Sequence, residues 1–159
     1  MEKKILLLGD PELYEVSTEV TKDELDYILK IKEDLRDTLL AFRDKYGVGR
    51  AIAAPQIGVH KRVIYRHLDT PILFIDPVLE FPDVRMYEVL DDCMSFPGLL
   101  VRVMRHKDCT VHYKNEKWED CEISFSGDMS ELIQHEYDHL DGILSTMRAI
   151  DDKSFVIKE

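Results

Sequence analysis

One stretch decides the fold of this chain: Gln134-His135-Glu136-Tyr137-Asp138-His139-Leu140-Asp141-Gly142, near the C-terminal end. On a helix, residues four apart lie on one face, so the ring nitrogens of His135 and His139 can bind one metal ion. Glu136 would lie beside that ion, where a carboxylate can take a proton from a water molecule and pass it on. The pattern also arises by chance on solvated helix faces, so the surrounding sequence has to support it.

The flanking residues predict a helix of about fourteen residues around this pattern. Asp128, with Glu131 three residues later, has the form of a capping box, and Gly142 suits the position just past the helix end. Apolar residues recur at helical spacing: Met129, Leu132, Ile133 and Leu140. The helix would therefore be largely buried, and a metal ion would remove the cost of burying two unpaired histidines.

A catalytic ion of this kind needs a third protein ligand and an open position for water. A metzincin would have its third histidine three residues after Gly142, but Ser145 stands at that position. A thermolysin-like enzyme would need a glutamate about twenty residues or more downstream, and only the last residue, Glu159, could serve. The ligand is therefore expected upstream. The best candidate is Cys93, in Leu90-Asp91-Asp92-Cys93-Met94-Ser95-Phe96-Pro97-Gly98, because thiolate binds zinc-like and iron-like ions strongly.

Composition predicts one ordinary globular domain of residues 1–159, with 45% apolar and 33% charged residues. A formal net charge of −11 argues against direct binding of nucleic acid or of an anionic membrane. The apolar run within residues 1–8 is too short for a signal peptide or a membrane span. The three cysteines form no paired framework, so we expect a reducing cytoplasm.

The remaining elements predict an α+β fold, with antiparallel strands packed around the metal-binding helix and a long helix near the N-terminus. Thr21 with Glu24 forms a capping box that starts the long helix, and Gly47 ends it after about Tyr46. Branched and aromatic residues predict strands at 63–65, 72–75, 78–81 and 87–90, with a bend at Asp76-Pro77 between the second and the third. Three more strands alternate apolar and polar residues around positions 101–103, 109–113 and 121–125.

Small residues crowd the segment after the long helix, over positions 47–58. Such a run lets another backbone approach closely, which is typical of a ligand edge, although a tight connection under a sheet has the same composition. Gln56 belongs to this run. Its side-chain amide could donate a hydrogen bond to a carbonyl or an oxyanion.

Three separated segments together resemble the peptide deformylase family along nearly the whole chain. The family motif Gly-x-Gly-(apolar)-Ala-Ala-x-Gln is similar to Gly49-Arg50-Ala51-Ile52-Ala53-Ala54-Pro55-Gln56. The motif Glu-Gly-Cys-Leu-Ser resembles Asp91-Asp92-Cys93-Met94-Ser95, and Gln-His-Glu-x-Asp-His-Leu-x-Gly is matched fully from Gln134 to Gly142. The resemblance implies a metal-dependent hydrolase that removes the N-formyl group from formyl-methionyl peptides and releases formate.

By this resemblance, Cys93, His135 and His139 would hold one divalent ion, Fe²⁺ in cells and replaceable by Zn²⁺, Ni²⁺ or Co²⁺. Glu136 would relay the proton of the attacking water to the leaving amine. Gln56 and the backbone N–H of Met94 would donate to the developing oxyanion. The peptide would lie as an extended strand against the segment that starts at Gly49.

The chain also departs from the family at four positions: Arg50 replaces an aliphatic residue, Ala51 and Asp92 replace glycines, and Asp91 replaces glutamate. We expect all four to flank the substrate, with Arg50 and Asp92 paired across the cleft. These changes leave an alternative open, a deformylase-like protein that binds metal and peptide with low or altered hydrolysis. The chain ends 17 residues after Gly142, whereas many bacterial members continue into a basic helix, so ribosome contact is not expected.

Overall fold

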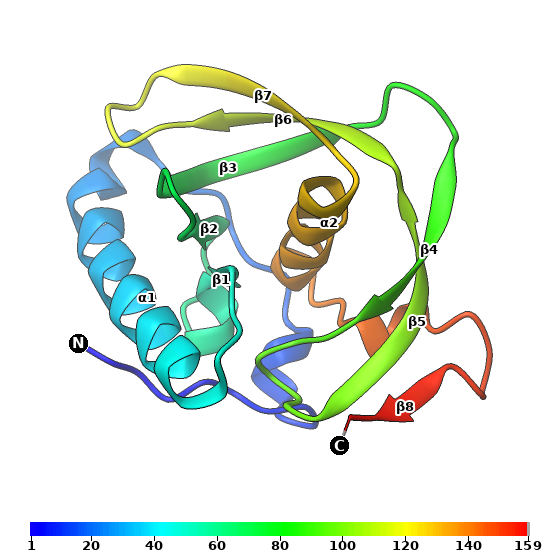
Figure 1. The fold of residues 1–159 in the computed structure, drawn as a ribbon. Coiled ribbons are helices and arrows are strands. Elements are labelled where there is room, and N and C mark those ends of the chain that lie inside the picture. Colours follow the sequence, from blue (N-terminus) through cyan, green and yellow to red (C-terminus); the bar gives the residue numbers. More distant parts are fainter. Residues whose placement is uncertain (159) are drawn as a thin grey trace.

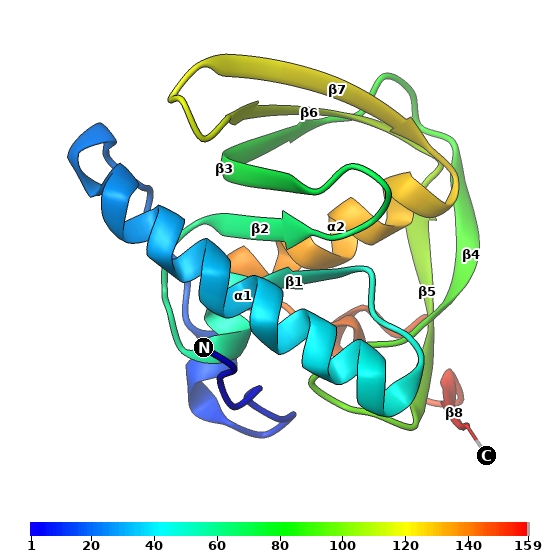
Figure 2. The same ribbon diagram turned by 60° about the vertical axis from the view of Figure 1, so that its left-hand side comes forward.

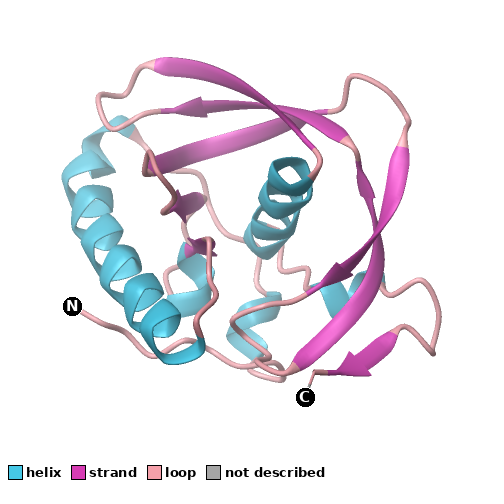
Figure 3. Ribbon diagram, in the orientation of Figure 1, coloured by secondary structure: helices cyan, strands magenta, loops and turns pink. Residues whose placement is uncertain are grey.

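Helix α2, at Asp128–Leu140, lies in the middle of the molecule, with strands curving around it. The larger of two sheets has five strands. It lies on one side of this helix, the smaller sheet lies on the other, and helix α1, at Leu25–Tyr46, lies on the outside (Figure 1). Figure 3 shows the same arrangement by secondary structure, with the two helices separated by strands. The computed structural model describes residues 1–158, and Glu159 lies outside them. The α+β prediction is confirmed.

The larger sheet is antiparallel throughout, in the order β1-β2-β3-β6-β7. Its strands are β1 at Ala51–Ala53, β2 at Val63–Arg66, β3 at Ile72–Glu80, β6 at Asp108–Lys114 and β7 at Asp120–Ser126. Consecutive residues of β1 and β2 are buried. Because successive side chains point to opposite faces of a sheet, both faces of these strands are covered. One face meets α1 and the other meets α2.

The smaller sheet has the order β4-β5-β8 and supplies the other wall around α2. Its strands are β4 at Met86–Asp91, β5 at Leu99–His106 and β8 at Phe155–Ile157. Residues Val101, Val103 and Arg105 alternate with exposed positions, so one face of β5 is buried. Cys93 follows directly after β4, which places that residue next to α2.

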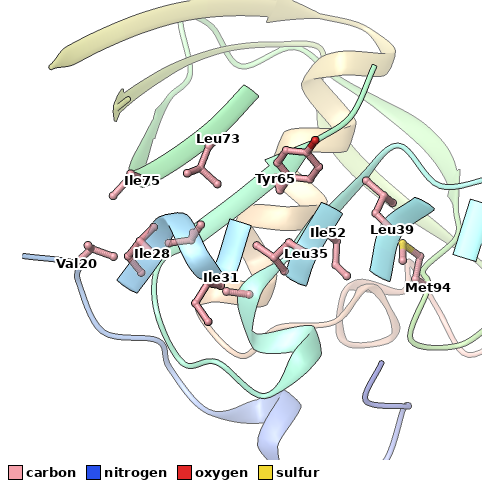
Figure 4. Packing of buried hydrophobic residues seen from close by; sticks show 12 residues of the cluster. Val20, Ile28, Ile31, Leu35, Leu39, Ile52, Tyr65, Leu73, Ile75 and Met94 are labelled. Atoms are coloured by element: carbon pink, nitrogen blue, oxygen red, sulfur yellow. The ribbon is translucent and has the colours of Figure 1, made fainter. Parts of the chain in front are cut away.

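Helix α1, at Leu25–Tyr46, covers the outer face of the larger sheet (Figure 2). Its apolar stripe packs against β1, β2 and β3 in the cluster of Figure 4: Val20, Ile28, Ile31, Leu35, Leu39, Ile52, Tyr65, Leu73, Ile75 and Met94. Gly47 ends the helix with a φ of 73°, a left-handed conformation that glycine adopts without strain. Among residues 1–158, no helix has the length and apolarity that crossing a membrane requires.

Short 3-10 helices complete the chain: η1 at Pro11–Tyr14, η2 at Lys22–Glu24, η3 at Ala54–Ile57 and η4 at Ser145–Arg148. The predicted box of Thr21 with Glu24 opens η2, where Glu24 Oε1 accepts the Thr21 N–H at 2.9 Å. This turn leads straight into α1. The long helix therefore begins as predicted, with a 3-10 turn in front of it.

The capping box predicted at Asp128 is wrong. Gly127, with a φ of 64°, is the N-terminal cap of α2, and Glu131 turns its carboxylate toward Arg50 instead of back to the helix start. The other end follows the prediction. The N–H of Gly142 bonds to the His139 carbonyl at 3.2 Å and that of Ile143 to the Asp138 carbonyl at 2.9 Å, which is a Schellman motif.

The bend predicted at Asp76-Pro77 does not separate two strands. β3 runs through it, and its pairing with β6 shifts between Ile75 and Val78 as a bulge. Pro77 has no N–H for the ladder, and Asp76 adopts a φ of 49°. The Asp76 carboxylate accepts the backbone N–H of Val20 at 2.8 Å, so the bulge ties the sheet to the segment before α1.

Candidate metal centre and active site

Cys93, His135 and His139 lie close together, and Cys93 and His135 line a cleft. Cys93 Sγ lies 3.3 Å from His139 Nε2, and one ligand atom from each residue falls within 4.8 Å of the others. All three side chains are buried. Helix α2 supplies two of these side chains one turn apart, and the segment after β4 supplies the third, so the three residues predicted as ligands lie close enough together to hold one ion.

Asp91 fixes the orientation of His135. Its Oδ2 lies 2.8 Å from His135 Nδ1, which leaves Nε2 on the side of the ring that faces Cys93 and His139. Asp91, which we expected to flank the substrate, is part of the cleft lining, and its side chain is only 4% exposed and bonded inward. Burial raises the pKa of Asp91, but the nearby charges of His135 and Arg105 outweigh burial and lower that pKa to about 2.

Arg105 holds Asp91 from behind, in a buried network that the sequence analysis missed. Its guanidinium donates to Asp91 at 2.9 Å and to Asp138 at 2.8 Å, and Arg148 reaches Asp138 at 2.9 Å. One signal was present in the sequence. Arg105 continues the apolar phase of Val101 and Val103, and a charge on a buried phase indicates a buried partner.

Replacing Arg105 by methionine should lower the free energy of unfolding by about 3–5 kcal/mol, because two buried carboxylates then lose their shared cation. Arg102→Met, on the exposed face of the same strand, is the matched control and should change stability by no more than about 0.5 kcal/mol. Denaturant unfolding of both variants measures the difference. Equal stability of the two would refute a structural role for the network.

The donor set fits a divalent metal ion. Burial, followed by the charge of His135, holds the pKa of His139 well below its usual value, so its imidazole is neutral and able to ligate. Burial also lowers the pKa of His135, but Asp91 and Cys93 outweigh burial and raise that pKa well above its usual value, so His135 would release a proton on binding an ion. Thiolate with two imidazoles suits zinc-like and iron-like ions. Three protein ligands leave a position free for water or substrate, the arrangement of catalytic sites.

Glu136 lies beside these ligands and is only 4% exposed. Burial raises the pKa of Glu136 to about 7, against a smaller opposing effect of His135. Its Oε1 is buried and has no hydrogen-bond partner among residues 1–158. A buried carboxyl group with a pKa near neutrality can both accept and return a proton.

Gln56 is buried near the Cys93 thiol and is held by hydrogen bonds. Its Oε1 accepts the backbone N–H of Ala53 at 2.9 Å, and its Nε2 donates to Ser95 Oγ at 3.1 Å and lies 3.7 Å from Cys93 Sγ. Met94 packs its side chain into the cluster under α1. The backbone that follows Cys93 is therefore anchored in the core.

The cleft has a volume of about 860 Å³, and Gly49, Arg50, Ala51, Asp92 and Met94 line it together with Cys93, His135 and Glu136. Gly49 has a φ of 132°, and its carbonyl oxygen accepts two hydrogen bonds from the Arg43 guanidinium, so hydrogen bonds hold the backbone at this position. The pair expected between Arg50 and Asp92 does not form. Arg50 instead donates to Glu131 at 2.9 Å, and Asp92 is exposed.

The chain matches known proteins over almost its full length. The family model described as polypeptide deformylase covers residues 2–155. A peptide deformylase from Pseudothermotoga lettingae is 37% identical over all of this chain and 90% of that protein, and one from Carboxydothermus hydrogenoformans is 36% identical over 92% of each.

Solved structures give the same result. A class I type b peptide deformylase from Acinetobacter baumannii superposes with a TM-score of 0.85 at 27% identity, covering 93% of this chain and 99% of that one. The peptide deformylase of Thermotoga maritima has a TM-score of 0.82 at 29% identity, covering 95% and 99%. The fold is therefore that of these proteins.

Proposed function

The chain belongs to the polypeptide deformylase family, and we propose that its catalytic centre is the cleft formed by Cys93, His135, His139 and Glu136. It is a metal-dependent hydrolase that removes the N-formyl group from nascent peptides and releases formate. The observation that carries the assignment to this cleft is the convergence of three buried side chains next to the Glu136 carboxyl group, whose buried Oε1 has no hydrogen-bond partner among residues 1–158.

One divalent ion would be held by Cys93, His135 and His139, with Fe²⁺ as the proposed ion in cells and Zn²⁺, Ni²⁺ or Co²⁺ as substitutes. When bound, the ion supplies Lewis acidity at the water and at the formyl carbonyl. Asp91 and Arg105 support this proposal because they hold the His135 ring in the ligating orientation.

Protein groups supply the proton transfer and the hydrogen bonds that the reaction needs. Glu136 takes the proton of the attacking water at its free Oε1 and delivers it to the amine that leaves. The Gln56 amide and the Met94 backbone N–H donate to the oxygen of the formyl group as negative charge develops there. The fixed backbone around Gln56 supports this role because an oxyanion donor has to be preorganised.

The peptide would lie extended along Gly49, Arg50 and Ala51 on one wall of the cleft, with Asp92 on the other. The peptide deformylase of Acinetobacter baumannii has been crystallised with Met-Ala-Ser bound, which supports a short peptide as the occupant here. Residues 1–159 would act as one domain. The three unpaired cysteines favour the cytoplasm as its location.

Formate release from formyl-Met-Ala-Ser tests this proposal, with protein purified anaerobically and loaded with Fe²⁺ or Ni²⁺. Metal-free protein should be inactive, and Gln56→Ala should lower kcat by on the order of a hundredfold because one oxyanion donor is lost. Folded, metal-loaded protein that releases no formate would refute the assigned cleft. Unchanged kcat in Gln56→Ala would remove Gln56 from the mechanism.

A further inference from the structure

An ion pair stands in the wall of the cleft next to the metal ligands. Glu131 precedes His135 by one helical turn, so both side chains lie on the same face of α2. Arg50 comes from the opposite wall, just before β1, and its guanidinium bonds to Glu131 Oε1 at 2.9 Å. Both residues line the cleft together with His135 and Glu136.

This pair lies within reach of the first side chain of a bound peptide. The formyl carbon must reach Glu136 and the ligands, and the nearest side chain is that of the residue carrying the formyl group. Residues four apart on a helix are separated by about 5–6 Å between Cβ atoms, which is within reach of one side chain. The end of that first side chain can therefore reach Arg50 and Glu131.

The ion pair leaves several N–H groups of Arg50 available for further hydrogen bonds. Glu131 is 9% exposed and Arg50 is 37% exposed, so the arginine faces the open part of the cleft. Within residues 1–158, the Arg50 guanidinium donates only to Glu131, through one of its nitrogens. A guanidinium carries five N–H donors, so the other N–H groups of Arg50 can donate to a bound peptide.

Different first side chains would meet this wall with different consequences. The thioether of methionine is a poor acceptor, so it would cover the free N–H groups of Arg50 without replacing their bonds to water. A carboxylate would compete with Glu131 for the arginine, and a cation would compete with Arg50 for the glutamate. A neutral side chain of methionine's length that ends in an oxygen acceptor would leave the pair intact and satisfy Arg50.

We propose that the pair of Arg50 and Glu131 sets the specificity of this deformylase for a first residue with a neutral oxygen acceptor at the end of its side chain. Glutamine and methionine sulfoxide have this chemistry, and both are favoured over unmodified methionine. The proposal rests on the function assigned to the cleft, and it adds the class of formyl peptide that the cleft prefers.

The first test compares formyl-Met-Ala-Ser with formyl-Met(sulfoxide)-Ala-Ser, because these two peptides differ by a single oxygen atom. Metal-loaded protein should show kcat/KM higher by about tenfold or more for the sulfoxide, and formyl-Gln-Ala-Ser should behave like the sulfoxide. Equal values, or a preference for methionine, would overturn the inference and leave the proposed function standing.

The second test removes the pair. Arg50→Ile with Glu131→Ile takes away both charges together, because either change alone would leave a charge unpaired in the wall. This double variant should reverse the order and prefer formyl-Met-Ala-Ser. Glu131→Gln, which keeps the shape of the side chain, should raise kcat/KM for formyl-Glu-Ala-Ser relative to formyl-Gln-Ala-Ser, because Arg50 is then free to pair with the substrate carboxylate. If the double variant still prefers the sulfoxide peptide and Glu131→Gln leaves the ratio of kcat/KM values for formyl-Glu-Ala-Ser and formyl-Gln-Ala-Ser unchanged, the proposal is contradicted.

A control and a binding measurement complete the design. Lys32→Gln with Glu116→Gln removes an ion pair of 2.8 Å that lies outside the cleft lining, and the substrate order should not change. Calorimetry with Met-Ala-Ser, Met(sulfoxide)-Ala-Ser and Gln-Ala-Ser measures the same preference without turnover. Should no formyl peptide be hydrolysed, the proposed function fails, and equal affinities of these three peptides would then overturn the inference separately.

Discussion

Replacing Glu136 by glutamine should lower kcat for formate release by about 10²–10⁴-fold while metal content stays at the wild-type level. Glutamine keeps the size of the side chain and cannot accept the proton. Glu136 is no ligand in the arrangement of Cys93, His135 and His139, so the ion should stay bound. Elemental analysis and a formate assay on the same preparation measure the two quantities.

Glu122→Gln is the matched control, since Glu122 is exposed on β7 and lies outside the cleft lining. It should keep both metal and activity. A Glu136→Gln protein with most of its activity would refute the proton role. Loss of metal in that variant would instead move Glu136 into the ligand set.

The sequence predicted the centre of the molecule well because its signals are local. Histidines four residues apart share a face on any helix, and Gly142 ends the helix through bonds to the preceding turn. The buried stripe of α1 was predictable for the same reason, because Ile28, Leu35 and Leu39 follow the helical period.

The errors arose where a distant residue decides a local contact. Asp128 and Glu131 satisfy the capping-box pattern, but Arg50 lies 81 residues from Glu131 in the sequence and takes its carboxylate. Arg50 was expected to pair with Asp92, because the two residues carry opposite charges in two segments that border one cleft. Only the fold shows that the helix, and not the opposite segment, presents the nearer carboxylate.

The network behind His135 could not be derived from spacing. Asp91 lies 44 residues before His135, and Arg105 lies 33 residues before Asp138, so no periodicity connects them. From the sequence, Asp91 was expected only as a departure from the family near the substrate. Its function as the partner of His135 depends on β4 and β5 pairing beside α2, which brings Asp91 opposite Val101.

Replacing Cys93 by alanine should abolish tight metal binding, so that metal content falls from about one ion per chain to a small fraction. The reason is geometric. The two imidazoles come from one helix and occupy one side of the site, and the thiol 3.3 Å from His139 Nε2 closes the opposite side. His135→Ala should have the same effect, because it removes a ligand and leaves Asp91 buried without its ring partner.

Cys109→Ala separates metal loss from a general effect of losing a buried thiol. Cys109 is 1% exposed, packs between α2 and the larger sheet, and does not belong to the group of Cys93, His135 and His139. Its replacement should leave metal content unchanged and lower the free energy of unfolding by on the order of 1 kcal/mol. Elemental analysis of both dialysed variants gives the comparison. Full metal content in Cys93→Ala would disprove the ligand set, because the remaining pair of histidines would then hold the ion without a thiolate.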